Sequence, residues 1–501
     1  MTLTNGSRPN ILLIVLDTVR AQQLSCYGHT GSTTPRIDQI AEEGVRYHNA
    51  ISPSPWTLPA HASLFTATFP SKHGAHELHK YLDLRLPTLA EFLTNRGYQT
   101  IGLSNNSWIS NTFGLARGFD TFVKIWQIAQ TESDVTNRAV SAHEDMQHLR
   151  AADVMERILD GNPMKNLING IYARFLWRRY DKGARRINSE MRRWLTKKRS
   201  HTRPFFMFAN YLEAHLKYRP PAPYDKMYLP PGCTVQSAGK VSQDAWSYIS
   251  RTKEMSANDF QILTALYDGE VTYLDGRIGE IYDLLHDVGL LDDTVLIITS
   301  DHGENIGDHG LMDHQYCLYD TLLRVPLIIR YPRLFPAGEQ VFGQVQLVDV
   351  FPTVMDILNT AGETFRQEMQ GETLLPDRLD DRQRKFAVAE YLGPQPNIKL
   401  LRQRVPGADG RIQMYDRSLA CIRVEDFKYI QASDGCDELF DIRIDPSEAV
   451  NLISSKEQVW RRMRRELAAW QEQTGPAYQA GELLSVDRAT RSRLEALGYL
   501  G

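Results

Sequence analysis

The chain contains several short, continuously apolar segments that the pattern predicts as buried strands. They read NILLIVLD from residue 10, YQTIGLSNN from 98, PFFMFANYLEAH from 204, DTVLIITSDHG from 293 and VPLIIRYP from 325. Strands buried on both faces of a mostly parallel sheet read in this way, and amphipathic segments such as 85–96 and 258–288 separate them. The pattern therefore predicts an α/β sandwich, with a large mostly parallel central sheet between helices.

The pattern changes after about residue 385. The segments FAVAEYLG, SLACIRVEDFKYIQAS and DELFDIRI are typical of short antiparallel strands, and EQVWRRMRRELAAWQEQ of a helix that follows them. We therefore expect a large α/β domain over 1–384 and a smaller α+β domain with a short antiparallel sheet over 385–501.

Composition narrows the class of protein. Of the 501 residues, 42% are apolar and 24% are charged, which is typical of a globular chain with a large core. The formal net charge is −4. A chain without a basic excess gives no global electrostatic reason to expect a nucleic-acid partner, whereas a small anionic substrate remains compatible with it.

Signals for the cellular compartment are mostly negative. The five cysteines are scattered and show no CxxC spacing, which argues against a disulfide framework or a structural zinc site. The first apolar run, 11–16, is far too short to span a membrane and lacks the flanks of a secretory signal. We therefore expect a cytoplasmic protein without a transmembrane segment.

One stretch of the large domain, about 125–200, is predicted to be a basic helical insertion. Residues 174–203 are much richer in Lys and Arg than in Asp and Glu, and Trp177 and Trp194 are interspersed among them. Such a segment could contact an anionic membrane surface or guide an anionic substrate. The plainer interpretation is a surface helix whose arginines cover the sheet, and we favour it over the membrane interpretation.

Polar residues follow directly after several of the predicted strands. In open α/β sheets, ligands bind outside the carboxyl ends of the strands, so these residues should gather at one rim. Carboxylates together with an imidazole are suitable ligands for a divalent transition-metal ion. The polar residues in question are Asp17, Asn105, Asn106, His215, Asp301 and His302.

The segment SPSPWTLPAHASLFTATFPSKHGAH, 52–76, contains a threonine with two interpretations. Thr57 lies where a predicted helix begins, with Pro59 just inside it. Thr is a common helix cap, and local sequence alone favours that role. The alternative is a nucleophile, whose hydroxyl would need activation by a metal ion and the positive end of the helix.

Taken together, these motifs resemble the sulfatase branch of the alkaline phosphatase superfamily. The resemblance covers nearly the whole chain and includes the segments PNILLIVLDTVRAQQLSCYG, SPWTLPAHASLFTATFPSKHG, PFFMFANYLEAHLKYRPP, ITSDHGENIGDHGLMDHQYCLYDTLLRVPLIIRYP, LVDVFPTVMDIL and ELFDIRIDPSEAVNL. It implies that a divalent ion is held at the rim. One ion is favoured, because the chain lacks the second Asp-x-x-x-His set that two-zinc phosphatases use, and a second ion stays open. Manganese or zinc is favoured because of the histidine, and calcium or magnesium would also fit. The implied ligands are Asp17, Thr57, Asp301 and His302.

The chain departs from the sulfatase pattern at the nucleophile. Sulfatases have Cys or Ser in a C/S-x-P-x-R motif, which becomes formylglycine, whereas TLPAH here offers Thr57 and places His61 where Arg is usual. Threonine cannot become that aldehyde, so its ester must be hydrolysed by renewed attack on the central atom. Phosphorus tolerates this route readily. The resemblance therefore shifts towards Thr-using relatives such as phosphodiesterases, phosphonate hydrolases, phosphatases and phospho-group transferases.

The resemblance also suggests roles for other polar residues. His215 lies where the family usually places a substrate-contacting histidine, and His314 lies close to where many sulfatases use Lys. Both are candidate acid–base catalysts beside Thr57. The candidate substrate-binding residues are His61, Asn106, Lys217 and His309.

These features predict a metal-dependent, sulfatase-like hydrolase. It would cleave phosphodiesters, phosphomonoesters or phosphonate monoesters through a covalent Thr57 intermediate. The alternatives are a sulfuric ester hydrolase that works without formylglycine, a phospho-group transferase, and a catalytically inactive binding protein. The sequence indicates neither the natural substrate nor the oligomeric state.

Overall fold

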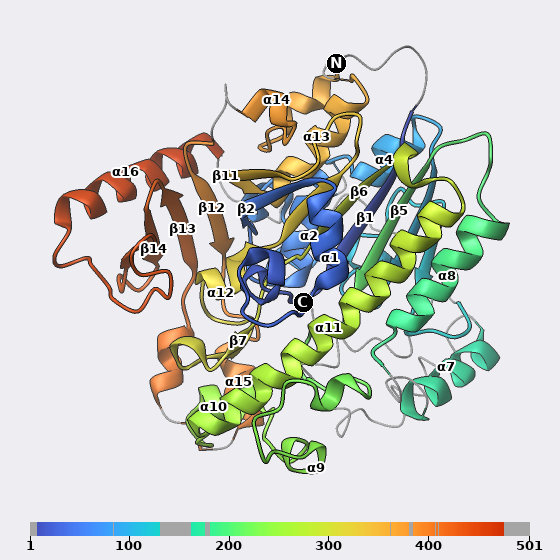
Figure 1. Ribbon diagram of the computed structural model, residues 1–501. Helices are drawn as coiled ribbons and strands as arrows, with labels where there is room; N and C mark the ends of the chain where they lie inside the picture. The colour runs from blue at the N-terminus through green and yellow to red at the C-terminus, as the bar shows by residue number, and fades with distance from the viewer. Residues whose placement is uncertain are drawn as a thin grey trace.

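The computed structural model describes residues 8–83, 85–130, 162–175, 181–360, 362–379, 384–405, 407–408 and 410–474 (Figure 1). Its centre is a nine-stranded sheet with the order β11-β2-β10-β6-β1-β5-β3-β4, in which β9 also pairs with β2. The strands are β1 (Asn10–Leu16), β2 (Val45–Ile51), β3 (Gln99–Ser104), β4 (Thr121–Lys124), β5 (Phe205–Tyr211), β6 (Thr294–Thr299), β9 (Arg324–Val325), β10 (Leu327–Arg330) and β11 (Glu339–Gln346).

The middle of the sheet is parallel, as predicted. β1 lies between β5 and β6 and runs parallel to both, with Leu13 opposite Phe208 on one side and Ile297 on the other. β10 is antiparallel to β6 and β2. All five predicted strands are present. The pattern did not identify β2 and β11, because polar, partly exposed residues interrupt their apolar positions.

Helices cover both faces of the sheet, which confirms the predicted sandwich (Figure 1). α1 (Pro35–Glu42), α8 (Ala184–Lys197) and α11 (Ala257–Asp287) contribute to the core on one face. α2 (Thr57–Thr66), α4 (Leu89–Thr94) and α13 (Val350–Ile357) contribute to the core on the other. The side chains of β1 alternate between these two cores, so both of its faces are buried.

Shorter elements connect these layers. β7 (Asn305–Ile306) and β8 (Met312–Asp313) form a small antiparallel pair just after β6. The other helices are α3 (Pro70–His73), α7 (Pro163–Phe175), α9 (Val235–Ala238), α10 (Ala245–Ile249), α12 (Asp320–Leu323), α14 (Pro376–Leu379) and α15 (Ile398–Arg404).

The C-terminal part contains a separate antiparallel sheet, as predicted. Its order is β12 (Ala387–Tyr391), β13 (Leu419–Val424), β14 (Phe427–Ala432) and β15 (Glu438–Asp441). α16 (Glu457–Thr474) packs Met463 and Leu467 into the core of this sheet. A domain boundary at 384/385 stays a prediction, and the chain from 475 onwards lies outside the described residues.

In the basic segment, α8 is a surface helix that covers the sheet. Ile187, Met191 and Trp194 are buried against the sheet and α11, whereas Arg192 and Arg193 face solvent. A surface helix that covers the sheet is the plainer interpretation given above, and contact with a membrane surface stays a prediction. Trp177 and 131–161 lie outside the described residues. Across the described ranges, none of the helices combines the length and the apolar character needed to cross a bilayer.

Candidate active site

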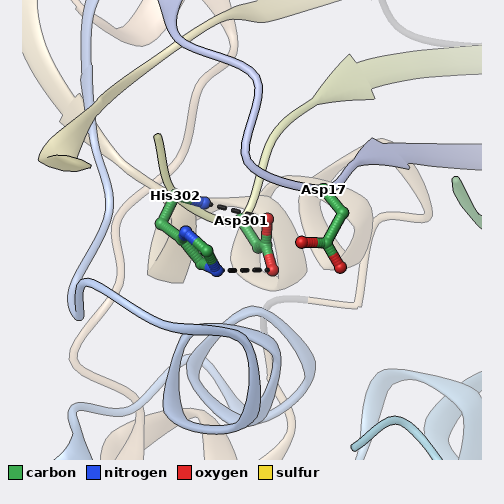
Figure 2. A group of neighbouring side chains, drawn as sticks. All are labelled: Asp17, Asp301 and His302. Atoms are coloured by element: carbon green, nitrogen blue, oxygen red, sulfur yellow. Dashed lines mark hydrogen bonds and ion pairs between the residues drawn. The ribbon is translucent and has the colours of Figure 1, made fainter. Parts of the chain in front are cut away.

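Two buried carboxylates face each other at the carboxyl end of the sheet. Asp17 follows β1, Asp301 lies two residues after the end of the neighbouring β6, and both side chains are completely buried. Asp301 Oδ1 accepts hydrogen bonds from the backbone N–H groups of Thr18 (3.3 Å) and His302 (3.0 Å). Asp17 Oδ1 and Asp301 Oδ2 have no hydrogen-bond partner among the described residues. Figure 2 shows the two carboxylates turned towards the same space.

The electrostatics of this pair fit a bound cation. Burial, and next the charge of Asp17, raise the pKa of Asp301 well above its usual range. Two facing carboxylates in a dry environment are unfavourable unless a positive charge lies between them. One ligand atom each from Asp17, Asp301 and His302 lies within 4.8 Å of the others. The donor set therefore suits a divalent metal ion, as the sequence predicts.

His302 is oriented as a neutral imidazole ligand. Its Nδ1 lies 2.9 Å from the carbonyl oxygen of Gly303, a contact that places the ring proton on Nδ1. Burial lowers its pKa well below the usual value. Nε2 therefore carries a lone pair, and it lies 3.3 Å from Asp301 Oδ2 and 3.4 Å from Thr57 Oγ1.

Thr57 is the first residue of α2, but it is not the cap of that helix. The capping position is occupied by Trp56, and no side chain caps the helix there. The Thr57 hydroxyl oxygen instead accepts a hydrogen bond from Asn106 Nδ2 (3.1 Å), and the same amide group donates to Asp17 Oδ2 (2.7 Å). The capping interpretation of Thr57 is therefore wrong. Its hydroxyl lies in the carboxylate site, at the positive end of α2.

His61 lies one turn further along α2 and is completely buried. Its Nδ1 is 2.9 Å from the carbonyl oxygen of Thr57 and 3.5 Å from Asp301 Oδ2, and its ring packs edge-on against Phe65 and Phe208. Burial lowers its pKa to about 4, so the ring is neutral at physiological pH. This geometry supports the first turn of α2, and a substrate contact for His61 stays a prediction.

Two further histidine rings extend from His302 towards the outside of the site. The ring of His314 lies 4.5 Å from that of His302, and the ring of His215 lies 4.9 Å from that of His314. His314 Nδ1 contacts Asp313 Oδ1 (2.6 Å) and Glu304 Oε1 (3.2 Å). Burial alone would lower the pKa of His314, but the two carboxylates outweigh it and raise that pKa well above its usual value.

The other two predicted substrate-binding residues, His309 and Lys217, have different neighbours. His309 stacks on the ring of Tyr319 at 3.6 Å, and burial lowers its pKa. Lys217 is exposed and lines a cavity of about 350 Å³ together with Arg219 and Leu266. Within the described ranges, neither side chain forms a hydrogen bond with the carboxylate site, so their roles there stay predictions.

Comparison with known proteins agrees with this geometry. The model of the sulfatase family matches residues 9–360, which is more than half of the chain. The chain belongs to the sulfatase family. As a member, it is an ester hydrolase.

Similar proteins include both sulfatases and phosphonate hydrolases. Arylsulfatase K of Xenopus laevis is 24% identical over 498 residues, covering 92% of this chain and 82% of the relative. The phosphonate monoester hydrolase of Agrobacterium radiobacter has a TM-score of 0.68 and 23% identity, covering 93% of this chain and 96% of its own. A third structure, solved with its substrate D-glucosamine-2-N,6-O-disulfate, has a TM-score of 0.64 and 21% identity, covering 94% and 100%.

Sequence reasoning missed three charged residues of this sulfatase-family site. Glu304 and Asp313 flank His314, and their positions beside the DHG and MDH segments were the available signal. The third residue, Lys182, lies in the basic segment 174–203. Its buried Nζ donates to the carbonyl oxygen of His215 (2.6 Å) and contacts Glu270 Oε1 (2.8 Å), so it supports the loop that carries His215.

Proposed function

We propose that this sulfatase-family chain hydrolyses phosphoesters, namely phosphodiesters, phosphomonoesters or phosphonate monoesters, with Thr57 as the nucleophile. One observation carries the proposal. The Thr57 hydroxyl oxygen lies 3.4 Å from His302 Nε2 and 3.1 Å from Asn106 Nδ2, beside the two facing carboxylates. A hydroxyl used only for packing or capping would not need this surrounding set of ligands.

The residue type favours phosphorus over sulfur. A formylglycine hydrate can expel its bound group by breaking its own carbon–oxygen bond, whereas a threonine ester has no such route. Its hydrolysis requires a second attack at the central atom, and phosphoryl groups undergo such in-line displacements readily. Thr57 therefore supports a double displacement at phosphorus, in which the Thr57 oxygen replaces the leaving alcohol and water then replaces Thr57.

The chain supplies most of the groups that such a reaction needs. Asp17, Asp301 and His302 would hold the divalent ion, which when bound lowers the pKa of a hydroxyl and neutralises anionic charge. Asn106 fixes the orientation of the Thr57 hydroxyl and can donate only from its amide nitrogen. The positive end of α2 adds favourable potential at the same oxygen. We favour manganese or zinc because one of the ligands is an imidazole.

His314 and His215 are the acid–base pair in this proposal. Because the Nδ1 of His314 contacts two carboxylates, its Nε2 is the nitrogen left for a substrate. A protonated His314 can give its proton to the leaving oxygen. The Nδ1 of His215 contacts the Leu216 carbonyl oxygen at 2.7 Å, which leaves its Nε2 as an acceptor for a proton from the attacking water.

Hydrolysis of a sulfuric ester is the second candidate function. Arylsulfatase K and the structure solved with a disulfated glucosamine motivate it. Both reactions would use the same carboxylates and the same leaving-group side of the site. They differ in the central atom, so direct comparison of substrates distinguishes them.

The test is a substrate panel with matched variants. The purified chain is assayed with nitrophenyl phosphate, a bis-phosphodiester, a phosphonate monoester and nitrophenyl sulfate, each with and without added metal. Thr57→Val removes the hydroxyl and keeps the shape of the side chain. Thr66→Val is the control, because Thr66 lies at the other end of α2 and donates its hydroxyl to the Ala62 carbonyl oxygen (2.7 Å).

We expect metal-dependent turnover of at least one phosphorus ester. Loss of a catalytic nucleophile lowers kcat by several orders of magnitude, on the order of 10⁴-fold or more, so Thr57→Val should be nearly inactive and Thr66→Val should be active. Turnover of the sulfate alone would favour the second candidate. Full activity of Thr57→Val would contradict a Thr57 nucleophile in either case.

A further inference from the structure

The single-turn helix α12 contacts both chain segments that carry the candidate active site. Leu322 O accepts a hydrogen bond from the N–H of Gly303 (2.7 Å), the residue after His302. Leu323 O accepts one from the N–H of Ser52 (2.7 Å), on the segment that leads to Thr57. α12 therefore bridges these two segments.

The packing at this contact leaves no free space. A Cβ atom added to Gly303 would lie 2.0 Å from the carbonyl oxygen of Thr321, which is far inside van der Waals contact. Thr321 also donates its hydroxyl to Asn305 Oδ1 (2.6 Å). A shift of α12 must therefore move the 301–305 segment as well, because close-packed interiors transmit displacement.

The start of α12 is held by charged residues of the C-terminal sheet and of the segment that follows it. Lys428 of β14 is completely buried, and its Nζ lies 2.8 Å from Asp320 Oδ1 and 2.7 Å from Glu448 Oε1. Arg423 Nη1 lies 2.9 Å from Asp320 Oδ2. Glu448 Oε2 accepts a hydrogen bond from the N–H of Asp320 (2.6 Å). These four residues are called the Lys428 network below.

The Lys428 network differs from a surface ion pair in that it is buried and its contacts use separate atoms. Asp320 accepts from two cations through separate oxygens, and Glu448 contacts both Lys428 and the backbone of α12. Removal of one partner from a buried ion pair leaves an uncompensated charge, so the remaining groups must move or take up water. Such movement would reach α12 first.

We propose that the Lys428 network is a positioning device for the active site. It fixes α12, and α12 in turn fixes the spacing between Thr57 and the Asp301–His302 pair. Lys428, Asp320 and Glu448 are positioning residues, because they act through backbone contacts and do not touch the reacting atoms. The C-terminal sheet thus takes part in metal binding and catalysis from a distance.

A purely structural role is the plainer interpretation of any buried ion network. It predicts that variants lose stability and keep the properties of the folded enzyme. The positioning role predicts that the folded variant also binds metal more weakly and turns over more slowly. The kinetic part of this inference rests on the proposed function, whereas the metal-binding part does not.

The experiment compares Lys428→Met with Tyr429→Phe in the full chain. Tyr429 is the next residue of β14, belongs to the core shared with α16 and donates its hydroxyl to Asp437, the residue before β15. Each protein is stripped of metal and titrated with Mn²⁺ at a temperature where it is fully folded. The readouts are the Mn²⁺ dissociation constant, kcat and KM on the best ester of the panel, and the unfolding midpoint.

We expect Lys428→Met to weaken Mn²⁺ binding and to lower kcat, each by about 10-fold or more, because a misplacement of about 1 Å can reduce the rate 100-fold. KM should change much less. Tyr429→Phe should lower only the unfolding midpoint. Asp320→Asn is the milder variant if Lys428→Met does not fold, and it should show the same effects in smaller measure.

A double variant that should restore part of the lost function provides an independent test. Lys428→Met combined with Glu448→Gln removes the charge of Glu448, which would otherwise be left without its lysine beside Asp320, and keeps an acceptor for the N–H of Asp320, so metal affinity and kcat should recover in part. Folded variants with lower stability but wild-type Mn²⁺ affinity and kcat would overturn the positioning role. If the wild type cleaves no ester, the proposed function fails, and the Mn²⁺ titration alone decides the role of Lys428.

Discussion

Replacement of Asp301 by asparagine should have opposite effects in the metal-free and metal-bound enzyme. The Oδ1 atom of Asp301 accepts two backbone hydrogen bonds, and asparagine retains an oxygen there. The substituted Nδ2 takes the place of Oδ2, which has no hydrogen-bond partner in the described part of the chain. Asp301→Asn therefore keeps the backbone contacts and removes one of the two carboxylates that face each other.

In the metal-free enzyme, this change relieves repulsion with Asp17, so Asp301→Asn should be at least as stable as the wild type. In the metal-bound enzyme, the order should reverse. At a metal concentration 100 times its dissociation constant, binding stabilises the wild type by about 2.7 kcal/mol. If the loss of a carboxylate ligand weakens binding about 100-fold, the variant gains only about 0.4 kcal/mol at the same concentration.

The assay is denaturant unfolding of both proteins after chelation and after addition of Mn²⁺. Asp356→Asn is the matched control, because Asp356 is a buried carboxylate that pairs with Arg366 (2.9 Å) away from the site. The control should lose stability equally with and without metal. Equal stabilisation of Asp301→Asn and wild type by Mn²⁺ would refute the assignment of Asp301 as a ligand.

Three further substitutions and one control test separate parts of the structure. Asn106→Leu removes the amide that orients the nucleophile, and kcat should fall about 100-fold, as for other lost donors at a reacting centre; a change in KM alone would contradict this role. Gly303→Ala places a Cβ atom 2.0 Å from the Thr321 carbonyl oxygen and should lower the free energy of unfolding by more than about 3 kcal/mol. Gly343→Ala is the control, because a Cβ atom added there meets nothing within 4 Å, and it should leave the free energy of unfolding nearly unchanged. Burial lowers the pKa of His73 to about 3. Because its ordinary pKa is about 6.5, the unfolded chain takes up the proton first, and stability is lost as the pH falls from 6.5 towards 3 at about 1.4 kcal/mol per unit. His73→Gln should flatten the pH dependence of unfolding between pH 6.5 and 4.5, and an unchanged slope would show that His73 is not buried and neutral.

The sequence predicts the parts of the site that depend on short-range patterns. Asp17 and Asp301 each follow a continuously apolar run, and neighbouring parallel strands bring such ends together. Asn106 is found in the same way, because it follows β3 on the same sheet. The apolar runs and the polar residues that end them are sufficient to predict these site residues, because the sheet itself sets their positions.

Other parts depend on contacts between distant segments. Lys428 and Asp320 are 108 positions apart, and no periodicity in the chain relates a residue of β14 to the start of α12. Lys217 is a different case. It lies two residues after His215 and its side chain lines a cavity with Arg219 and Leu266, so its role as a substrate contact stays a prediction, because the direction of a loop side chain cannot be read from its spacing.

Thr57 shows most clearly where prediction from local sequence fails. Its position at a helix start makes it look like a cap, and local rules give that role to any Ser or Thr there. The structure gives the capping position to Trp56 and turns the Thr57 hydroxyl towards Asn106 and His302. The tertiary arrangement of three segments thus overrides a local preference, which is common at functional sites.

The most direct measurement is mass spectrometry of the enzyme quenched with acid during turnover of its best phosphorus ester. We predict that the peptide containing Thr57 carries the phosphorus group that remains after the alcohol has left, and that this adduct is absent from Thr57→Val and from enzyme without substrate. Slower release of the group, for example in His215→Ala, should increase its amount. The same adduct on another residue, or turnover with inversion at phosphorus and an unmodified Thr57, would contradict the account.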